Sequence, residues 1–384
     1  MNPMIAQIKS LPDMVRQIVP DYLDKIQNTL SQRFCQSFDH LYLMGCGDSH
    51  HAALASQLAF RLLSGVVTQA LTAMQFSRYT AELLLDPARC LVIGISVSGE
   101  VARTVEGLLL ARKMDTKTLA VTANPHSRIG RAADWVIDST QPPFSDPEGM
   151  VIPGIRSYVS NQIALNLLAI YLAEFRARIP RKVVQTLIQQ LVDLGDAIEK
   201  TIELNEEKTK ELARFWSPQE EYIFLGSGPA YGGALFSAAK ILEASGDVAT
   251  GQDLEEWAHL QYFAKKVTTP TFIISAGDRD LSRAVEIATA AQAIGRHVAV
   301  IVPESKLSAF PKGVIQLPLA DGIPEVFQAA ISMLPGSMLA AYRAEQIGEP
   351  YFRNFGGGRE KEGGGGISRI RTSETKGLEC LRKV

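Results

Sequence analysis

Two Gly-x-Gly turns, each directly after a short apolar run, constrain the fold of this chain more than any other feature. Residues 41–44 lead into Gly45-Cys46-Gly47, and residues 222–225 lead into Gly226-Ser227-Gly228. The turns are 226 − 45 = 181 positions apart, and a helical pattern follows each. Apolar runs that end in small residues and alternate with helical patterns are typical of buried parallel strands with crossover helices. We therefore expect an α/β chain built from two copies of one doubly wound unit.

Further apolar runs complete both copies. They cover residues 90–95, 118–121 and 135–138 in the first copy, and residues 271–274, 297–302 and 314–317 in the second. A helix-rich segment over residues 155–214 joins the copies. We place the first domain at residues 25–180, the second at 205–345 and a separate tail at 346–384. The length of 384 residues suits two domains of ordinary size.

Composition and charge favour a soluble, cytoplasmic protein. The formal net charge is −2, so neither nucleic acid nor a membrane is expected as a partner. No signal peptide is recognisable, and charges interrupt every apolar run before the roughly 18 residues that a membrane span needs. The four cysteines are irregularly spaced without a Cys-x-x-Cys pair, so we expect reduced thiols and no metal site.

Two loops of the first copy are predicted to bind phosphate. They are Gly45-Cys46-Gly47-Asp48-Ser49-His50 and Ser96-Val97-Ser98-Gly99-Glu100, at the carboxyl ends of predicted strands, where open parallel sheets bind ligands. Glycine lets the backbone approach a phosphate, serine donates to its oxygens, and the following helix presents its N-terminus to the charge. Either loop alone fits a strand-to-helix turn capped by serine slightly better than a phosphate site, but the pair favours phosphate.

A nucleotide cofactor is not expected. His50 stands where a G-x-G-x-x-G turn needs its third glycine, and no acidic residue is well placed at the end of a second strand. No Walker-type lysine pattern occurs either. We therefore expect a site without a cofactor.

The two loops resemble those of a known family. Residues 45–52 resemble the GCGTSxHA loop of the isomerase half of glucosamine-6-phosphate synthase, and residues 95–100 resemble its ISQSGET loop. In the second copy, residues 239–245 are similar to its ALKLKEIS helix, and Glu256 and His259 then fall on its ELKHGP motif without a gap. The resemblance runs from about residue 25 to 355. It implies a three-layer αβα sandwich of the sugar-isomerase (SIS) type for each unit.

The resemblance also implies the residues that hold the substrate. Ser49, Ser96 and Ser98 would contact the phosphate of a sugar phosphate, with Gly47 in the first loop allowing its close approach. Val97 and Val101 replace polar residues that the family uses around this phosphate. Two hydrogen bonds are thereby lost, and the candidates to replace them are arginines of the tail: Arg353, Arg359 and Arg369.

The catalytic residues implied by the resemblance lie in the second copy. Glu243 would move a proton between C1 and C2, and His259 would open the sugar ring from across a homodimer interface with a shared active site. Lys240 precedes Glu243 by one helical turn, on the same face. Histidine titrates near neutral pH, and partial burial raises the pKa of a carboxylate toward a useful value. These residues also have non-catalytic interpretations. Lys240 and Glu243 could form an ordinary surface ion pair, and His259 could be a residue of an amphipathic helix beside Trp257.

Three departures from the family bear on the reaction. The chain lacks an N-terminal cysteine nucleophile and roughly half of the synthase's length, so it is not expected to take ammonia from glutamine by itself. The family's PRNLAK segment carries a lysine that forms a Schiff base, and glycine occupies that position after Phe352-Arg353-Asn354-Phe355. Lys361 lies nearby without an assigned role. Asp48 replaces a threonine of the family. A carboxylate near a phosphate is unfavourable unless a cation, such as a substrate amine, lies between them. The alternative is an Asp48 side chain that faces away from the phosphate.

The tail permits two interpretations. Residues 356–366 contain seven glycines, interrupted by Arg359-Glu360-Lys361-Glu362. A solvated tail and a glycine-hinged flap that closes arginines over the phosphate both fit this composition.

A retained catalytic pair without the lysine resembles the relatives that cleave fructosamine 6-phosphates or deaminate glucosamine 6-phosphate. We therefore expect aldose–ketose proton transfer on a 6-phosphorylated amino sugar or fructosamine, with release of the amine. A simple sugar-phosphate isomerase and a non-catalytic sugar-phosphate sensor remain as alternatives. The sequence does not identify the sugar or the amine.

Overall fold

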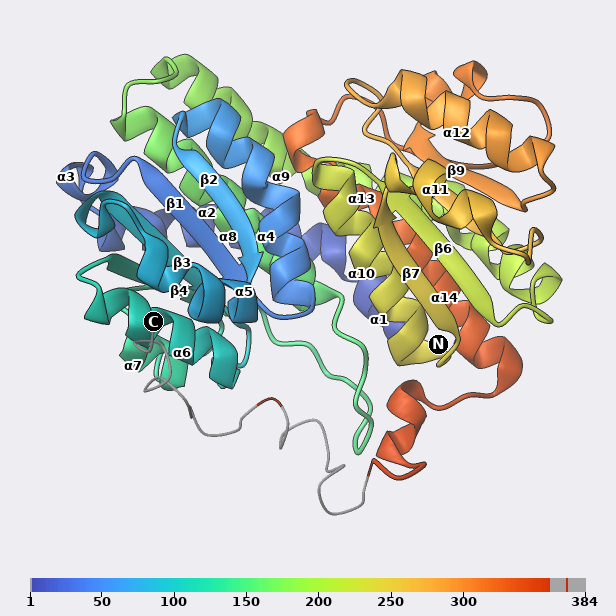
Figure 1. The fold of residues 1–384 in the computed structure, drawn as a ribbon, viewed down its shortest axis with the longest axis horizontal. Helices are drawn as coiled ribbons and strands as arrows, with labels where there is room; N and C mark the ends of the chain where they lie inside the picture. The colour runs from blue at the N-terminus through green and yellow to red at the C-terminus, as the bar shows by residue number, and fades with distance from the viewer. Residues whose placement is uncertain (1, 360–370, 372–384) are drawn as a thin grey trace. The chain divides into compact units, whose positions relative to one another are not determined.

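The computed structural model describes residues 2–359 and residue 371. It contains two sheets of five parallel strands, each flanked by helices (Figure 1). Val15–Pro142 and Ser157–Val192 form a compact unit around one sheet, the first-sheet unit. Met1–Met14, Pro143–Arg156 and Asp193–Asn354 form the second-sheet unit. The predicted α/β class, with two αβα units, is confirmed.

The two sheets repeat one strand order. The first sheet runs β2-β1-β3-β4-β5, and the second, taken from its other edge, runs β7-β6-β8-β9-β10. The strands of the first sheet are β1 (His40–Gly45), β2 (Val67–Thr72), β3 (Cys90–Ile95), β4 (Lys117–Thr122) and β5 (Trp135–Asp138). Those of the second are β6 (Glu221–Gly226), β7 (Val248–Asp253), β8 (Thr271–Ile274), β9 (Val298–Pro303) and β10 (Ile315–Leu319).

Helices precede, join and cover these strands (Figure 1). In the first half of the chain they are α1 (Pro3–Lys9), α2 (Leu11–Thr29), α3 (Gln32–Cys35), α4 (Asp48–Ala59), α5 (Ala73–Tyr79), α6 (Ala102–Lys113), α7 (Arg128–Ala132), α8 (Arg156–Phe175) and α9 (Arg181–Phe215). The others are α10 (Pro229–Ala244), α11 (Glu256–His259), α12 (Leu281–Ala293), α13 (Ala329–Ser332) and α14 (Leu334–Ile347). In the described part of the chain, no helix has the length and hydrophobicity needed to cross a membrane.

Central strands form because every side chain along them can be buried. All six residues of β3 and all six of β9 are buried, which matches their unbroken apolar sequences. The two strands that the sequence analysis did not predict, β2 and β7, are edge strands with mostly exposed or half-buried residues. A strand with one unpaired edge needs no continuous apolar run.

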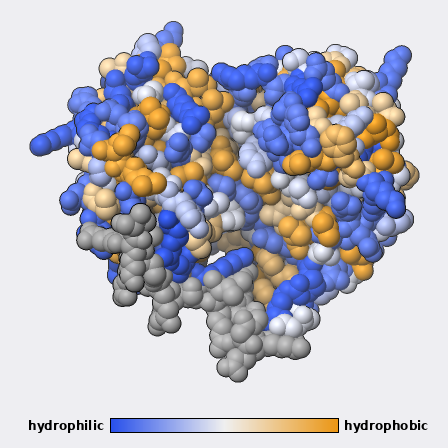
Figure 2. All heavy atoms as spheres, in the orientation of Figure 1, coloured by the Kyte–Doolittle hydropathy of each residue, from blue (hydrophilic) through white to orange (hydrophobic). Residues whose placement is uncertain are grey.

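Both units leave hydrophobic side chains exposed beside their edge strand (Figure 2). The first-sheet apolar face consists of Leu62, Val67, Met74, Tyr79, Leu83 and Leu85, on β2 and the segments around it. The second-sheet apolar face consists of Leu242, Val248, Leu260, Tyr262, Phe263 and Val267, on β7 and the segments around it. Val67 and Val248 open equivalent strands, 248 − 67 = 181 positions apart. Exposed apolar groups that lie together are typical of contact surfaces.

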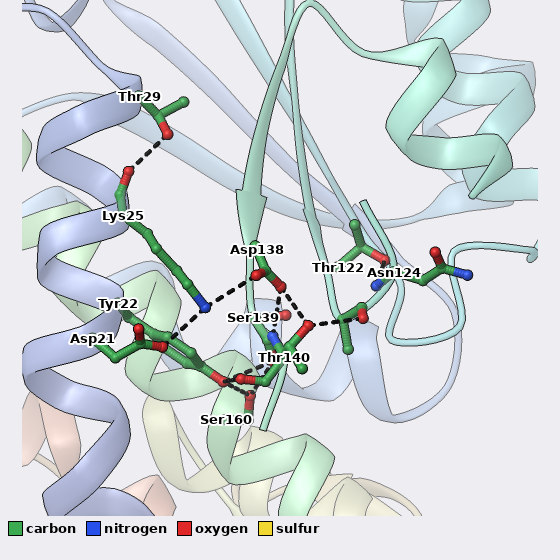
Figure 3. A network of polar contacts seen from close by, with 11 residues as sticks. Asp21, Tyr22, Lys25, Thr29, Thr122, Asn124, Asp138, Ser139, Thr140 and Ser160 are labelled. Atoms are coloured by element: carbon green, nitrogen blue, oxygen red, sulfur yellow. Dashed lines mark hydrogen bonds and ion pairs between the residues drawn. The ribbon is translucent and has the colours of Figure 1, made fainter. Parts of the chain in front are cut away.

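A polar network fastens α2 and α8 to the carboxyl end of β5 (Figure 3). Lys25 Nζ of α2 lies 3.0 Å from Asp138 Oδ2 at the end of β5. The buried Tyr22 hydroxyl donates to the Ser139 carbonyl at 2.7 Å and lies 2.8 Å from Ser160 Oγ of α8. Buried polar groups keep their hydrogen bonds in a folded protein, so this network fixes the carboxyl end of β5. The predicted phosphate loops follow β1 and β3 at the same end of the sheet.

Candidate functional site

The first predicted phosphate loop joins β1 to α4. Gly47 is the N-cap of α4 with φ +53°, and open space surrounds the position that a Cβ would take there. At Gly45 a Cβ would lie 2.8 Å from the backbone carbon of Ser49, so only glycine fits. Ser49 N donates to the Cys46 carbonyl at 3.2 Å. These glycines place Ser49 in the first turn of α4, at a helix N-terminus.

The second loop joins β3 to α6 and lies at the same edge as the first. β1 and β3 pair in parallel with Met44 opposite Gly94, so their carboxyl ends are neighbours. Ser96 Oγ accepts from Gly99 N at 3.2 Å, and Ser98 Oγ accepts from Glu100 N at 3.3 Å. In these bonds both hydroxyls are acceptors, so neither bond uses a hydroxyl proton. The structure thus brings the three predicted phosphate serines to one edge of one sheet.

A charged cluster that the sequence analysis missed stands beside these loops. Glu106 of α6 is fully buried, with its oxygens 2.6 Å from Arg78 Nε and 2.5 Å from Arg103 Nη1. Burial raises the pKa of the Cys46 thiol in the first loop, and the nearby Arg103 opposes this rise. This cluster places two guanidinium groups next to the loops. An Arg-x-x-Glu spacing at the start of the helix was the available signal.

Asp48 starts α4 and points along its own helix. Its carboxylate lies 3.7 Å from His51 Nδ1, and its side chain is 27% exposed. Burial raises the pKa of Tyr158 on α8, and the charge of Asp48 adds to this rise. Asp48 therefore lies close to a buried tyrosine at the same edge of the first sheet. Its negative charge beside the phosphate serines suits a substrate that also carries a cation.

His50 makes the stability of the first-sheet unit depend on pH. Burial lowers the pKa of His50 to about 4, and the neighbouring His51 adds to the shift. The unfolded chain takes up this proton near pH 6.5 and the folded chain does not, so stability falls as pH falls from about 6.5 to about 4. The full loss corresponds to about 3 kcal/mol.

Urea unfolding at about pH 7 and about pH 5 tests this expectation. The wild type should lose roughly 2 kcal/mol more than His50→Gln between these values. His126→Gln, which replaces an exposed histidine of the same unit, should behave as the wild type. Equal pH dependence of wild type and His50→Gln would contradict the expectation.

The predicted catalytic pair lies on α10 in the second-sheet unit. Lys240 is fully buried, with its ammonium 4.6 Å from the centroid of the Phe236 ring and in ion-pair contact with Glu243 Oε2. The Glu243 side chain is 23% exposed. Because the lysine is buried and the carboxylate is not, this pair differs from an ordinary surface ion pair. It holds a partly exposed carboxylate against a buried cation, which fixes where the carboxylate points.

His259 is the last residue of α11, and its side chain is 65% exposed. Its Nε2 lies 3.4 Å from Glu255 Oε1, and Glu255 Oε2 accepts from Arg283 Nε at 2.7 Å. His259 belongs to the same short segment as Leu260, which is part of the second-sheet apolar face. An exposed imidazole on an exposed apolar surface suits a group that acts at a contact between chains.

Arg353, assigned to the phosphate by the sequence, lies at the end of α10. Its Nη2 donates to the carbonyl oxygen of Glu243 at 2.9 Å. Arg359 Nη1 donates to the Gly356 carbonyl at 2.8 Å. Lys361 and Arg369 lie outside the described residues. Arg353 also forms an ion pair, with its Nε 3.8 Å from Glu349 Oε1, so its described contacts are with backbone carbonyls and one carboxylate.

The second sheet carries equivalent loops that do not suit phosphate. Ser227 Oγ donates to Asp253 Oδ2 at 3.0 Å, and Ser275 Oγ donates to Asp280 Oδ1 at 2.6 Å. Burial raises the pKa of Asp280. Carboxylates thus take the hydroxyl protons that a phosphate would need. The loops of the first sheet therefore suit a phosphate better than those of the second. The described residues hold no group of three or more His, Cys, Asp or Glu arranged for a metal.

Comparison with known proteins defines the class. Residues 36–171, which run from before β1 into α8, match the model of the SIS domain. This match covers about a third of the chain, mainly the first-sheet unit. The chain is also homologous to the isomerase domain of glucosamine–fructose-6-phosphate aminotransferase.

Three relatives illustrate the similarity. Glutamine–fructose-6-phosphate aminotransferase (isomerizing) from Gloeobacter violaceus is 26% identical over 353 residues, 90% of this chain and 56% of that protein. The chain thus spans just over half the length of this relative. The C-terminal domain of glucosamine–fructose-6-phosphate aminotransferase from Francisella tularensis superposes with a TM-score of 0.77 at 19% identity, covering 90% of this chain and 96% of that one. Glucosamine-6-phosphate deaminase from Thermotoga maritima superposes with a TM-score of 0.67 at 17% identity, covering 90% of this chain and 95% of that one. These two structures share the fold.

Proposed function

We propose that the chain is a phosphosugar-processing enzyme that moves a proton between C1 and C2 of a 6-phosphorylated amino sugar or fructosamine and releases the amine. The observation that carries the proposal is the partly exposed Glu243 carboxylate held by the buried Lys240. A carboxylate placed in this way suits a base that transfers a proton between adjacent carbons.

The first-sheet unit would bind the phosphate in this reaction. Ser49, Ser96 and Ser98 offer hydroxyls at the carboxyl edge of the sheet, and the Arg78–Glu106–Arg103 cluster places two guanidinium groups beside them. Asp48, close by, would attract the substrate's ammonium group. Proton transfer turns the carbon–nitrogen single bond into an imine. Water then hydrolyses the imine, which yields a carbonyl group and the free amine.

Two alternatives predict different products. A simple sugar-phosphate isomerase would interconvert aldose and ketose phosphates without releasing an amine. A non-catalytic sensor would bind the sugar phosphate without turnover. Asp48 favours the amine-releasing reaction, because a carboxylate beside the phosphate site disfavours a substrate whose only charge is negative.

Ligand binding and product analysis together test the proposed function. A 6-phosphorylated amino sugar at about 100 times its Kd should stabilise the fold by about 2.7 kcal/mol, and amine should accumulate in step with its disappearance. The unphosphorylated sugar should do neither at the same concentration. The Ser96→Ala/Ser98→Ala double variant should bind weakly. Isomerised sugar phosphate without amine supports the simple isomerase, and stabilisation without product supports the sensor.

The proposed active unit is a homodimer in which His259 acts on the site of the partner subunit. The support is the position of His259 beside Leu260, Tyr262 and Phe263, which are 59%, 43% and 75% exposed. A second copy of the chain would cover this surface and bring a titratable imidazole with it.

A further inference from the structure

The carboxyl end of α10 is held by an arginine that lies more than a hundred positions further along the chain. Arg353 Nη2 donates to the Glu243 carbonyl at 2.9 Å and lies 3.4 Å from the Ala244 carbonyl. The last carbonyls of a helix have no partner within the helix, and they carry the negative end of its dipole. A guanidinium at this position therefore satisfies the backbone of the residue proposed as the base.

A glycine just after α10 leaves room for this arginine. Gly246, two residues after α10, has φ +77°, and a Cβ there would lie 1.5 Å from Arg353 Nη1. The guanidinium therefore occupies the space that a side chain at position 246 would need. A Cβ there would push the end of the arginine side chain out of its present position.

The backbone that presents Arg353 is in an unfavourable conformation. Phe352, Arg353 and Asn354 have φ values of 53°, 53° and 47°, within the short turn Tyr351–Phe355. Consecutive non-glycine residues in the left-handed region are rare and persist only when their surroundings hold them. Here Arg353 N donates to the Pro350 carbonyl at 2.9 Å, and Tyr351 Oη donates to Asn2 Oδ1 at 2.9 Å.

We propose that Arg353 is a positioning residue, which fixes the last turn of α10 and thereby the direction of the Glu243 carboxylate. The inference rests on the proposed function, because it takes Glu243 as the base. It differs from the phosphate role that the sequence suggested, since the Nη2 group is engaged with two carbonyls of α10. A strained turn that ends in this contact is the kind of feature found at functional sites.

Three variants test this role. Arg353→Ala should lower kcat between about 10- and 100-fold, because a small displacement of a catalytic group has effects of this size. KM for the sugar phosphate should stay within about twofold, since the phosphate binds elsewhere. Gly246→Ala should reproduce the loss in kcat without changing the arginine. Arg353→Lys, which keeps a donor and the charge, should recover part of kcat.

Gly348→Ala is the matched control for Gly246→Ala. Gly348 has φ +68° and nothing within 4 Å of its would-be Cβ, so it carries the same backbone cost without a collision. Its kcat should equal that of the wild type. The pH profile of kcat/KM supplies a readout that a purely structural role would not move. Lys240 pairs with Glu243, and Glu349 lies 3.8 Å from Arg353 Nε; both stay in place in these variants. Loss of the arginine cation in Arg353→Ala should therefore shift the acidic limb of the profile to higher pH, and Arg353→Lys should restore it.

Several results would overturn the inference. A raised KM with unchanged kcat in Arg353→Ala would indicate that the residue binds the phosphate instead. Equal kcat in Gly246→Ala and Gly348→Ala would show that the contact does not matter for turnover, even if Arg353→Ala fails to fold. An inactive Glu243→Gln beside a fully active Arg353→Ala rejects the inference alone. A fully active Glu243→Gln rejects the proposed function and this inference with it.

Discussion

Replacing Glu243 by glutamine is expected to lower kcat by roughly 10²–10⁴-fold, the usual contribution of a general base. The amide keeps the shape of the carboxylate and can still accept a hydrogen bond from the buried Lys240 ammonium, so α10 should keep its structure. What is lost is the ability to take a proton. Affinity for the sugar phosphate should change little, because the serines proposed to bind the phosphate belong to the other unit.

The measurement separates binding from chemistry. Thermal stabilisation by the sugar phosphate reports binding, and amine release under saturating substrate reports kcat. Glu207→Gln on α9, whose side chain is 79% exposed, removes a carboxylate without touching α10 and should behave as the wild type. Turnover of Glu243→Gln at the wild-type rate would exclude this residue as the base.

The central part of each sheet could be predicted from the sequence because burial imposes one requirement on every residue. β3 and β9 are buried along their whole length and read as unbroken apolar runs. The edge strands β2 and β7 could not be predicted in this way. The sequence VATGQD of β7 satisfies an edge position through backbone pairing with β6, and its side chains are free to be polar.

The candidate site was predictable where a local pattern determines the chemistry. Glycines and serines at the ends of β1 and β3 identify the phosphate loops, and the i,i+3 spacing pairs Lys240 with Glu243. Long-range contacts leave no such pattern. The hydrogen bond from Arg353 to the Glu243 carbonyl joins residues 110 positions apart, so only the fold reveals it.

The second large effect is expected from mixing two inactive variants, Glu243→Gln and His259→Ala. If His259 serves the partner's site, each mixed dimer contains one site with both native residues and one with neither. A mixed dimer isolated through a different tag on each variant should then show about half the wild-type kcat, although each parent alone is nearly inactive. Co-expression followed by two affinity steps yields the species to assay.

The outcome distinguishes a shared site from one built within a single chain. In a single-chain site every subunit of the mixed dimer would lack either its base or its histidine, and activity would stay at the level of the parents. The exposure of His259 and of the adjoining Leu260 and Phe263 favours the shared site, since an imidazole that is 65% exposed lacks the enclosure that acid–base work on a sugar requires. Phe263→Asp on the same surface supplies a further check. It should weaken the dimer and lower activity together in otherwise native chains, because a carboxylate in an apolar contact must be desolvated without a partner.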